Sequence, residues 1–333
     1  EDNCKQYTSG VYKPVGLLQR YGESDLMYFG LLSGSYEHNT RGGVLRNEIL
    51  SISDEIDAST GQIQSGGIID TIDRLRISGY SHSSHSHDCG GIFNRPMNDG
   101  ECRMWGNPIA EMMYETLRYF SGAGSATSDF TYSGSTPDDD LGLPLATWDD
   151  PYAAGNYPYC SKAFMLVFSD TSPSYDTDQL PGTASEFGST FTGTLGTLDV
   201  ETLADTISTA EGISGSYFIG RNGSEYDGSC EAKTISGLGD IRGLCPEEPT
   251  KQGGYYSASV AYYGLTNDLH STAEEDQTVR TYTVALASPL PKIEIPVGTN
   301  TVSLVPFAKS AFYSGIPDST EGGFQPTNQI AEF

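Results

Sequence analysis

The run Ala163-Phe-Met-Leu-Val-Phe168 is uninterrupted and apolar, and an acidic, hydroxyl-rich stretch follows it directly: Ser169-Asp-Thr-Ser-Pro-Ser-Tyr-Asp-Thr-Asp-Gln-Leu-Pro-Gly182. Six apolar residues are typical of an interior strand and are too few to span a membrane. The polar stretch is therefore expected at the carboxyl end of that strand, which is where open α/β sheets bind their ligands.

The polar stretch offers a set of oxygen donors of the kind that hard divalent cations prefer. The candidate ligands for Ca or Mg are Asp170, Ser172, Ser174, Asp176 and Asp178. Two other interpretations stay open. The sequence Asp-Thr-Ser-Pro-Ser is also good turn chemistry, in which Asp and Ser side chains bond to their own backbone. Neighbouring exposed carboxylates such as Asp176 and Asp178 are in addition commonly just solvated.

Hydrophobic periodicity predicts further helices and strands on both sides of this run. Helices are expected after an Asn107 cap with Pro108 in the first position, from Asp199 to Glu211, and from Ser257 to Leu269. Strands are expected at 26–32, 279–286, 292–297 and 301–307, the last two as a C-terminal β-hairpin. This alternation predicts an α/β fold with an open, mainly parallel sheet flanked by helices.

Long segments rich in Gly, Ser, Thr, Asp and Tyr separate these elements, at about 78–103, 121–160 and 214–254. They are expected to be loop insertions. The six cysteines include no Cys-x-x-Cys pair, so disulfides in an exported protein are the simpler interpretation. The expected bridges are Cys89–Cys102, Cys230–Cys245 and Cys4–Cys160.

The chain has 18 Lys and Arg against 44 Asp and Glu, a formal net charge of −26. Such a charge repels polyanions, so nucleic acid is not an expected partner. No stretch approaches the length of a membrane span, and the first residue is Glu1, which suggests a mature or excised piece of a longer protein.

Several smaller features have competing interpretations. The run Ser81-His-Ser-Ser-His-Ser-His-Asp-Cys89 could bind a transition metal, although a loop tied down by Cys89 is the better interpretation. Tyr255, Tyr256, Tyr262 and Tyr263 could form an adhesive face or could in part be core. The acidic run Asp138-Asp-Asp140 is expected at the surface, and Asn222-Gly-Ser224 matches a glycosylation acceptor. No catalytic motif appears in a supporting context, so the chain is expected not to be an enzyme.

Five separated blocks resemble the N-terminal part of the PilC/PilY family of type IV pilus tip adhesins, in the right order. They are Tyr12-Lys-Pro-Val-Gly-Leu-Leu18, Phe29-Gly-Leu-Leu-Ser-Gly-Ser-Tyr36, Gly42-Gly-Val-Leu-Arg46, Phe168 to Gly182, and Phe324-Gln-Pro-Thr-Asn-Gln-Ile330. The resemblance implies a von Willebrand factor A-like domain at 1–290 with the three insertions. It also implies a β extension or linker at 291–333, and nothing in this chain resembles the family's propeller half with its calcium loop.

The resemblance also bears on the metal site and on the partners. It makes Asp170 similar to the third-loop aspartate of a von Willebrand A-like site and places Asn107 where a threonine ligand would be expected. The first-strand ligand loop would lie upstream of Glu1 or be absent. The implied location is the cell surface at the pilus tip, reached by export through the periplasm. The implied partners are minor pilins and a host-cell or abiotic surface ligand.

Three functions therefore compete at this stage. The first is an extracellular adhesion and pilus-biogenesis module that binds a surface or host ligand, with or without a divalent cation. The second is a structural assembly factor that docks minor pilins without metal. The third is a secreted carbohydrate-active enzyme that uses paired carboxylates.

Overall fold

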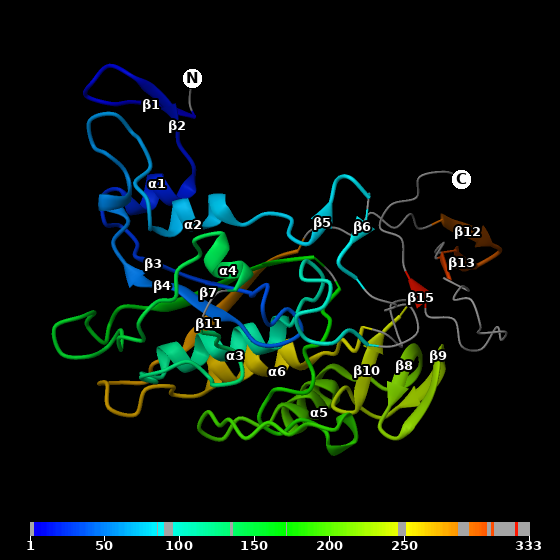
Figure 1. Ribbon diagram of the computed structural model, residues 1–333. Helices are drawn as coiled ribbons and strands as arrows, with labels where there is room; N and C mark the ends of the chain where they lie inside the picture. The colour runs from blue at the N-terminus through cyan, green and yellow to red at the C-terminus, as the bar shows by residue number, and fades with distance from the viewer. Residues whose placement is uncertain are drawn as a thin grey trace.

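The computed structural model describes residues 3–84, 86–89, 96–133, 136–170, 172–245, 251–285, 293–304, 308–309 and 324–325, and shows a mixed α/β chain with several small sheets (Figure 1). At 86–87, 226–230, 303–304, 308–309 and 324–325 the description is limited to the backbone.

The centre of the molecule is a two-stranded parallel sheet with helices on one face. Strands β7 (Ala163–Ser169) and β11 (Val279–Ala285) pair in parallel from Ala163↔Val279 to Ser169↔Ala285. Helices α3 (Ile109–Phe120) and α6 (Tyr256–Thr266) pack on this sheet, and α5 (Val200–Glu211) packs on α6 (Figure 1). The main hydrophobic core lies between these elements, where Tyr114, Leu117, Val200 and Val260 are fully buried.

The α5 helix shows why the sequence folds this way locally. The side chain of Asp199 accepts a hydrogen bond from the Thr202 amide (2.8 Å) and so caps the first turn. Gly212 takes the left-handed conformation (φ 70°) that ends the helix. The predicted helix from Asp199 to Glu211 is therefore confirmed. Two other predicted helix boundaries are wrong. Helix α3 begins at Ile109 without a side-chain cap from Asn107, and α6 ends at Thr266 rather than at residue 269.

The predicted open, mainly parallel sheet is not formed by the described residues, in which β7–β11 is the sole parallel pair. Strand β3 (Phe29–Ser33), which overlaps the strand predicted at 26–32, pairs antiparallel with β4 (Val44–Leu50) and does not join a parallel sheet. This hairpin contacts α3. The prediction that β7 is an interior strand is also wrong for this chain, because every second residue of β7 is exposed.

The segment 214–254, predicted to be a loop, contains a three-stranded antiparallel sheet. It consists of β8 (Gly215–Asn222), β9 (Glu225–Ile235) and β10 (Ile241–Leu244), with β8 in the middle. Gly223 and Ser224 connect β8 to β9, so the Asn-Gly-Ser sequence is a hairpin turn.

The C-terminal hairpin is confirmed as β12 (Ile293–Val297) paired antiparallel with β13 (Asn300–Leu304). The division of the chain at residue 290 stays a prediction.

Short elements complete the described part of the chain. The helices are α1 (Leu17–Gly22), α2 (Ile68–Arg74) and α4 (Pro137–Asp140), with 3-10 turns at Ser53–Glu55 and Ser185–Phe187. The strands pair as β1 (Cys4–Gln6) with β2 (Tyr12–Pro14), β5 (Tyr80–Ser81) with β6 (Ser86–His87), and β14 (Ala308–Lys309) with β15 (Phe324–Gln325). None of the described helices combines the length and the apolar character needed to cross a bilayer.

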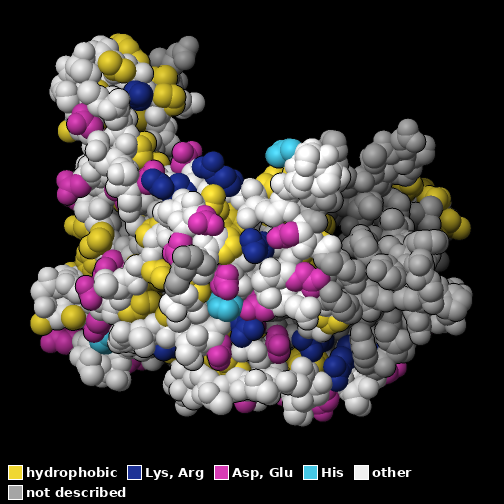
Figure 2. Space-filling view, in the orientation of Figure 1, with side chains coloured by type: hydrophobic (Ala, Val, Ile, Leu, Met, Phe, Trp, Pro, Cys, Tyr) yellow, Lys and Arg dark blue, Asp and Glu magenta, His cyan; other side chains and the backbone are white. Residues whose placement is uncertain are grey.

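Charged side chains of both signs are interspersed over the face that Figure 2 shows, and the N-terminal β1–β2 region projects from the body. The net charge of −26 is therefore not gathered into one broad acidic patch on this face.

Candidate functional site

Asn107 and Asp170 meet at the carboxyl end of β7, where the site was expected. The Asn107 side-chain amide Nδ2 donates to Asp170 Oδ1 (3.0 Å) and to Ser169 Oγ (2.9 Å). Asp170 Oδ1 also accepts from the backbone amide of Ser172 (2.9 Å). The start of α3 and the end of β7 are thus joined through side chains that the sequence places 63 residues apart.

Ser174 joins the same network through backbone and side chain. Its amide donates to the Asn107 carbonyl (2.9 Å), and its hydroxyl oxygen accepts from the Asn107 amide (2.9 Å). Four of the predicted ligands therefore bond to one another. This is the turn chemistry that the sequence left open as an alternative, since the Asn107 group facing Asp170 is a donor.

Asp176 lies apart from this network and is fully buried. Its Oδ1 accepts from the Gly254 amide (2.9 Å), while Oδ2 has no hydrogen-bond partner. Burial raises the pKa of Asp176 to about 7, against the opposing effect of the amides of Gly254 and Ala110. The expectation that this carboxylate is solvated is therefore wrong.

Asp178 faces a cation instead of the predicted ligand set. Its Oδ1 lies 4.0 Å from Arg242 Nη2. Burial raises the pKa of Asp178, and the Arg242 charge partly offsets that rise. The six predicted ligands therefore do not form one set: four of them bond to one another, while Asp176 and Asp178 each face a different partner.

Glu111, which the sequence analysis did not single out, is a second fully buried carboxylate here, after Asp176. Its Oε2 accepts from the Gly42 amide (2.5 Å) and its Oε1 accepts from the Gln179 amide (3.1 Å). Burial raises the pKa of Glu111 well above its usual range, and the charge of Asp178 adds to the rise. Nothing in the sequence indicated that Glu111 is buried. An acidic residue in the first turn of a helix is common at the protein surface, where it interacts favourably with the helix dipole.

Within the described residues, no group of three or more His, Cys, Asp or Glu side chains has an arrangement that could hold a metal ion. Part of the histidine run is described: the His82 ring makes an edge contact with Tyr80 (4.9 Å between centroids). His85 and the side chain of His87 lie outside the described residues. Of the four tyrosines, Tyr256 and Tyr263 are core residues, while Tyr255 and Tyr262 are exposed.

The loop after β7 packs closely against residues 251–254. The Tyr175 amide donates to the Lys251 carbonyl (2.9 Å), and the Thr177 hydroxyl donates to the Gln252 carbonyl (3.1 Å). A Cβ on Gly253 would lie 1.9 Å from the Pro173 carbonyl oxygen, so this approach requires glycine.

Cys89 and Cys102, both in the 78–103 insertion, form a disulfide. Cys102 is buried with Met97 and Tyr175, and the Met97 amide donates to the Tyr175 hydroxyl (3.0 Å). The described part of the insertion around Met97 and Cys102 therefore packs against the loop that follows β7.

The other cysteines give a mixed outcome. Cys245 is disulfide-bonded, and the side chain of its predicted partner Cys230 lies outside the described residues. Cys4 and Cys160 are both free, so the predicted third bridge is not formed.

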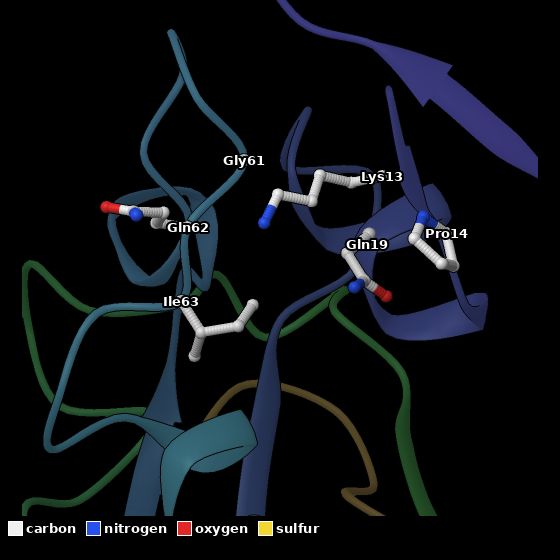
Figure 3. Close-up of a pocket in the computed structure, with 6 residues that line it drawn as sticks. All are labelled: Lys13, Pro14, Gln19, Gly61, Gln62 and Ile63. Carbon is white, nitrogen blue, oxygen red and sulfur yellow. The ribbon is translucent and has the colours of Figure 1, made fainter. Parts of the chain in front are cut away.

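A separate pocket of about 400 Å³ lies in the N-terminal region, between β2, α1 and the loop before α2 (Figure 3). Its lining is Lys13, Pro14, Gln19, Gly61, Gln62 and Ile63. It offers one ammonium group and two side-chain amides, and no catalytic pair.

Comparison with known proteins gives a consistent result. A family profile described as "PilY1 homolog, second domain" matches residues 29–264. The chain is 46% identical to a "Type IV pilus biogenesis factor PilY1 homolog" of Xylella fastidiosa, over all of this chain and 24% of the relative. It thus spans about a quarter of the curated relative's length. No solved structure matches the chain. Because the family profile covers most of the chain, the chain belongs to the PilY1 homolog family and corresponds to its second domain.

Proposed function

We propose that this chain is a non-enzymatic module of a type IV pilus biogenesis factor, acting outside the cell at the pilus tip as a structural assembly domain. The observation that carries the proposal is the match of residues 29–264 to the PilY1 homolog family, together with the 46% identity to a pilus biogenesis factor. Minor pilins are the proposed partners. A von Willebrand A-like relationship is part of the proposal, and the parallel β7–β11 pair with α3, α5 and α6 supports it.

The geometry favours assembly over cation-dependent binding. Asp170 already accepts from the Asn107 side chain and the Ser172 amide, which fixes the turn without a cation. Asp176 and Asp178 make their contacts with Gly254 and Arg242 instead of with Asp170.

Adhesion to a host-cell or abiotic surface is the second candidate. It is supported by the Cys89–Cys102 disulfide in the 78–103 insertion and by the packing of Cys102 against Tyr175 in the loop after β7. An adhesive surface made of loops needs such anchoring, because ordering a free loop on binding costs conformational entropy.

The experiment is complementation of a strain that lacks the full-length gene. Replacing the gene with a version without residues 29–264 should abolish surface pili while pilin stays present in the cell. Normal piliation would overturn the assembly role. Asp170→Ala separates the candidates: loss of surface attachment with normal piliation supports adhesion, whereas the matched surface variant Asp140→Ala should change neither.

Calcium or magnesium binding at Asp170 is tested separately on the purified protein. A cation bound to the native state would add RT ln(1 + [L]/Kd) to the free energy of unfolding and so raise the melting temperature. A rise at millimolar cation that Asp170→Ala abolishes would support a cation-dependent adhesion module. Pull-down of minor pilins that a chelator does not weaken would support the assembly role.

A further inference from the structure

One face of the β7–β11 sheet is apolar and exposed. Along β7, Ala163 and Met165 point into the core, so the alternate residues point outward. The outward apolar residues are Phe164 (47% exposed), Leu166 (56%) and Phe168 (70%), and on β11 Tyr282 (50%) and Val284 (43%). The exposed Arg280 lies opposite Phe164, at the start of the same face. We call the five apolar side chains the outer sheet face.

The register makes the outer sheet face continuous. Leu166 lies opposite Tyr282 and Phe168 lies opposite Val284. The Phe164 and Tyr282 rings are 6.1 Å apart between centroids, so the diagonal neighbours also touch. A contiguous apolar patch of this kind on a folded protein marks a surface that another structure covers.

The edge of β7 away from β11 has no strand beside it among the described residues. Parallel sheets occur almost always with more strands and with both faces covered. The sequence of β7 agrees, because six consecutive apolar residues are typical of a parallel strand buried on both sides.

Strand β11 differs from β7 in a way that decides which edge is incomplete. Arg280, Thr281 and Thr283 interrupt its apolar residues, as expected of a strand nearer the margin of a sheet. The apolar β7 therefore has the pattern of the inner strand, and the sheet would continue at the edge of β7 away from β11.

We propose that the edge of β7 away from β11 and the outer sheet face are completed by a strand and covering apolar residues from the same polypeptide, outside the 333 residues of this chain. The 24% coverage of the Xylella fastidiosa relative supports this occupant, since three quarters of such a protein lies outside the matched region. A segment of the same polypeptide also has the advantage of a high effective concentration over a separate partner.

The test places the photoreactive amino acid p-benzoylphenylalanine at position 168 of the full-length protein, with position 77 as the control. Ile77 is exposed to a similar degree (69%) and belongs to the segment between α2 and β5. Illumination should give an intramolecular crosslink from position 168 to a peptide outside these 333 residues, identified by mass spectrometry. Position 77 should give no such crosslink.

Three other outcomes would overturn the proposal. A dimer-sized product whose yield rises with protein concentration would assign the outer sheet face to a second copy. A crosslink that forms with a different pilus protein would assign it to a partner. Absence of any protein crosslink from position 168, with the full-length protein folded by circular dichroism, would leave the face exposed to solvent.

A second measurement does not depend on photochemistry. Phe168→Cys and Ile77→Cys in the full-length protein are compared by maleimide labelling, read out on the individual peptides so that Cys4 and Cys160 do not interfere. Phe168→Cys should label at least ~10-fold more slowly than Ile77→Cys, and the difference should vanish in denaturant. Equal labelling rates in the native protein contradict the proposal.

Discussion

Arg46 and Asp138 lie 92 residues apart in the sequence and form an ion pair in which neither side chain is exposed. Arg46 also donates to the Tyr132 hydroxyl (2.6 Å) and to the Gly34 carbonyl (3.0 Å). Asp138 in turn accepts from the amides of Tyr36 and Glu37 (3.0 and 3.1 Å). The pair therefore fixes the segment after β3 to the 121–160 insertion.

Asp138→Ala should strongly destabilise the protein, because it leaves the buried guanidinium of Arg46 without its counter-charge. The expected loss in the free energy of unfolding is about 3–5 kcal/mol, measured by urea denaturation. Asp140→Ala is the matched control, since Asp140 belongs to the same acidic run and is exposed; it should change stability by less than about 0.5 kcal/mol. Equal effects of the two variants would contradict this role of the ion pair.

The buried carboxylate of Asp176 should make stability fall as pH rises. Its pKa in the folded protein is about 7 instead of 3.8. The native state therefore keeps a proton between these values that the unfolded chain releases. The contribution of this group is fully present below the unfolded pKa and is lost as pH rises through the folded pKa.

The measurement is the free energy of unfolding of the native sequence and of Asp176→Asn at pH 4 and pH 8. The variant keeps a side-chain oxygen that accepts from the Gly254 amide, and it cannot ionise. Between pH 4 and pH 8 its free energy of unfolding should therefore fall by roughly 2–4 kcal/mol less than that of the native protein. Glu111→Gln should have an effect of the same sign, because burial raises the pKa of Glu111 too. Parallel pH profiles of the native protein and both variants would refute the prediction.

Gly253→Ala should loosen the loop that follows β7. A methyl group there would overlap the Pro173 carbonyl, which is backbone and cannot rotate away. The expected cost is about 1–3 kcal/mol, with faster hydrogen exchange at the Tyr175 and Gly254 amides. Gly124→Ala is the control, because nothing lies within 4 Å of the added carbon and no left-handed backbone is involved. Unchanged exchange at Tyr175 in Gly253→Ala would argue against the close packing.

Removing the Cys89–Cys102 disulfide should release the 78–103 insertion. The cysteines are 13 residues apart, and closing a loop of that size is worth about 3 kcal/mol. Limited proteolysis of the double variant Cys89→Ser, Cys102→Ser should show new cleavage within the insertion, near Met97. The double variant Cys4→Ser, Cys160→Ser alters free cysteines and should keep the native pattern; cleavage near Met97 in it as well would show that the effect is not specific to the bridge.

Local chemistry made part of the fold predictable. The α5 helix carries its start and stop signals in Asp199 and Gly212, and both act as expected. The β7 run and the β12–β13 hairpin are likewise encoded over a few residues. The family resemblance, rather than local chemistry, implied that Asn107 and Asp170 belong to one site, and their side chains are hydrogen-bonded.

Features set by distant parts of the chain were not predictable from local patterns. Asp138 resembles a surface residue in sequence, and its burial depends on Arg46 arriving from β4. Glu111 and Asp176 are similar, since backbone amides from Gly42 and Gly254 accommodate them. The β8–β9 hairpin could have been predicted from Asn222-Gly223, because Asn-Gly is typical of a two-residue hairpin turn. The segment was instead predicted to be a loop because it is rich in Gly and Ser.

The directions of the paired strands determine how the chain would respond to stretching. Because β7 and β11 are parallel, tension before Ala163 and after Ala285 slides the strands past each other, and all seven paired positions resist together. The antiparallel β12–β13 hairpin has its two ends side by side, so the same tension peels it open from the Ile293↔Leu304 pair, one pair at a time. In a single-molecule pulling experiment, the β12–β13 hairpin should unfold at low force. The β7–β11 pair should stay folded until the force is much higher.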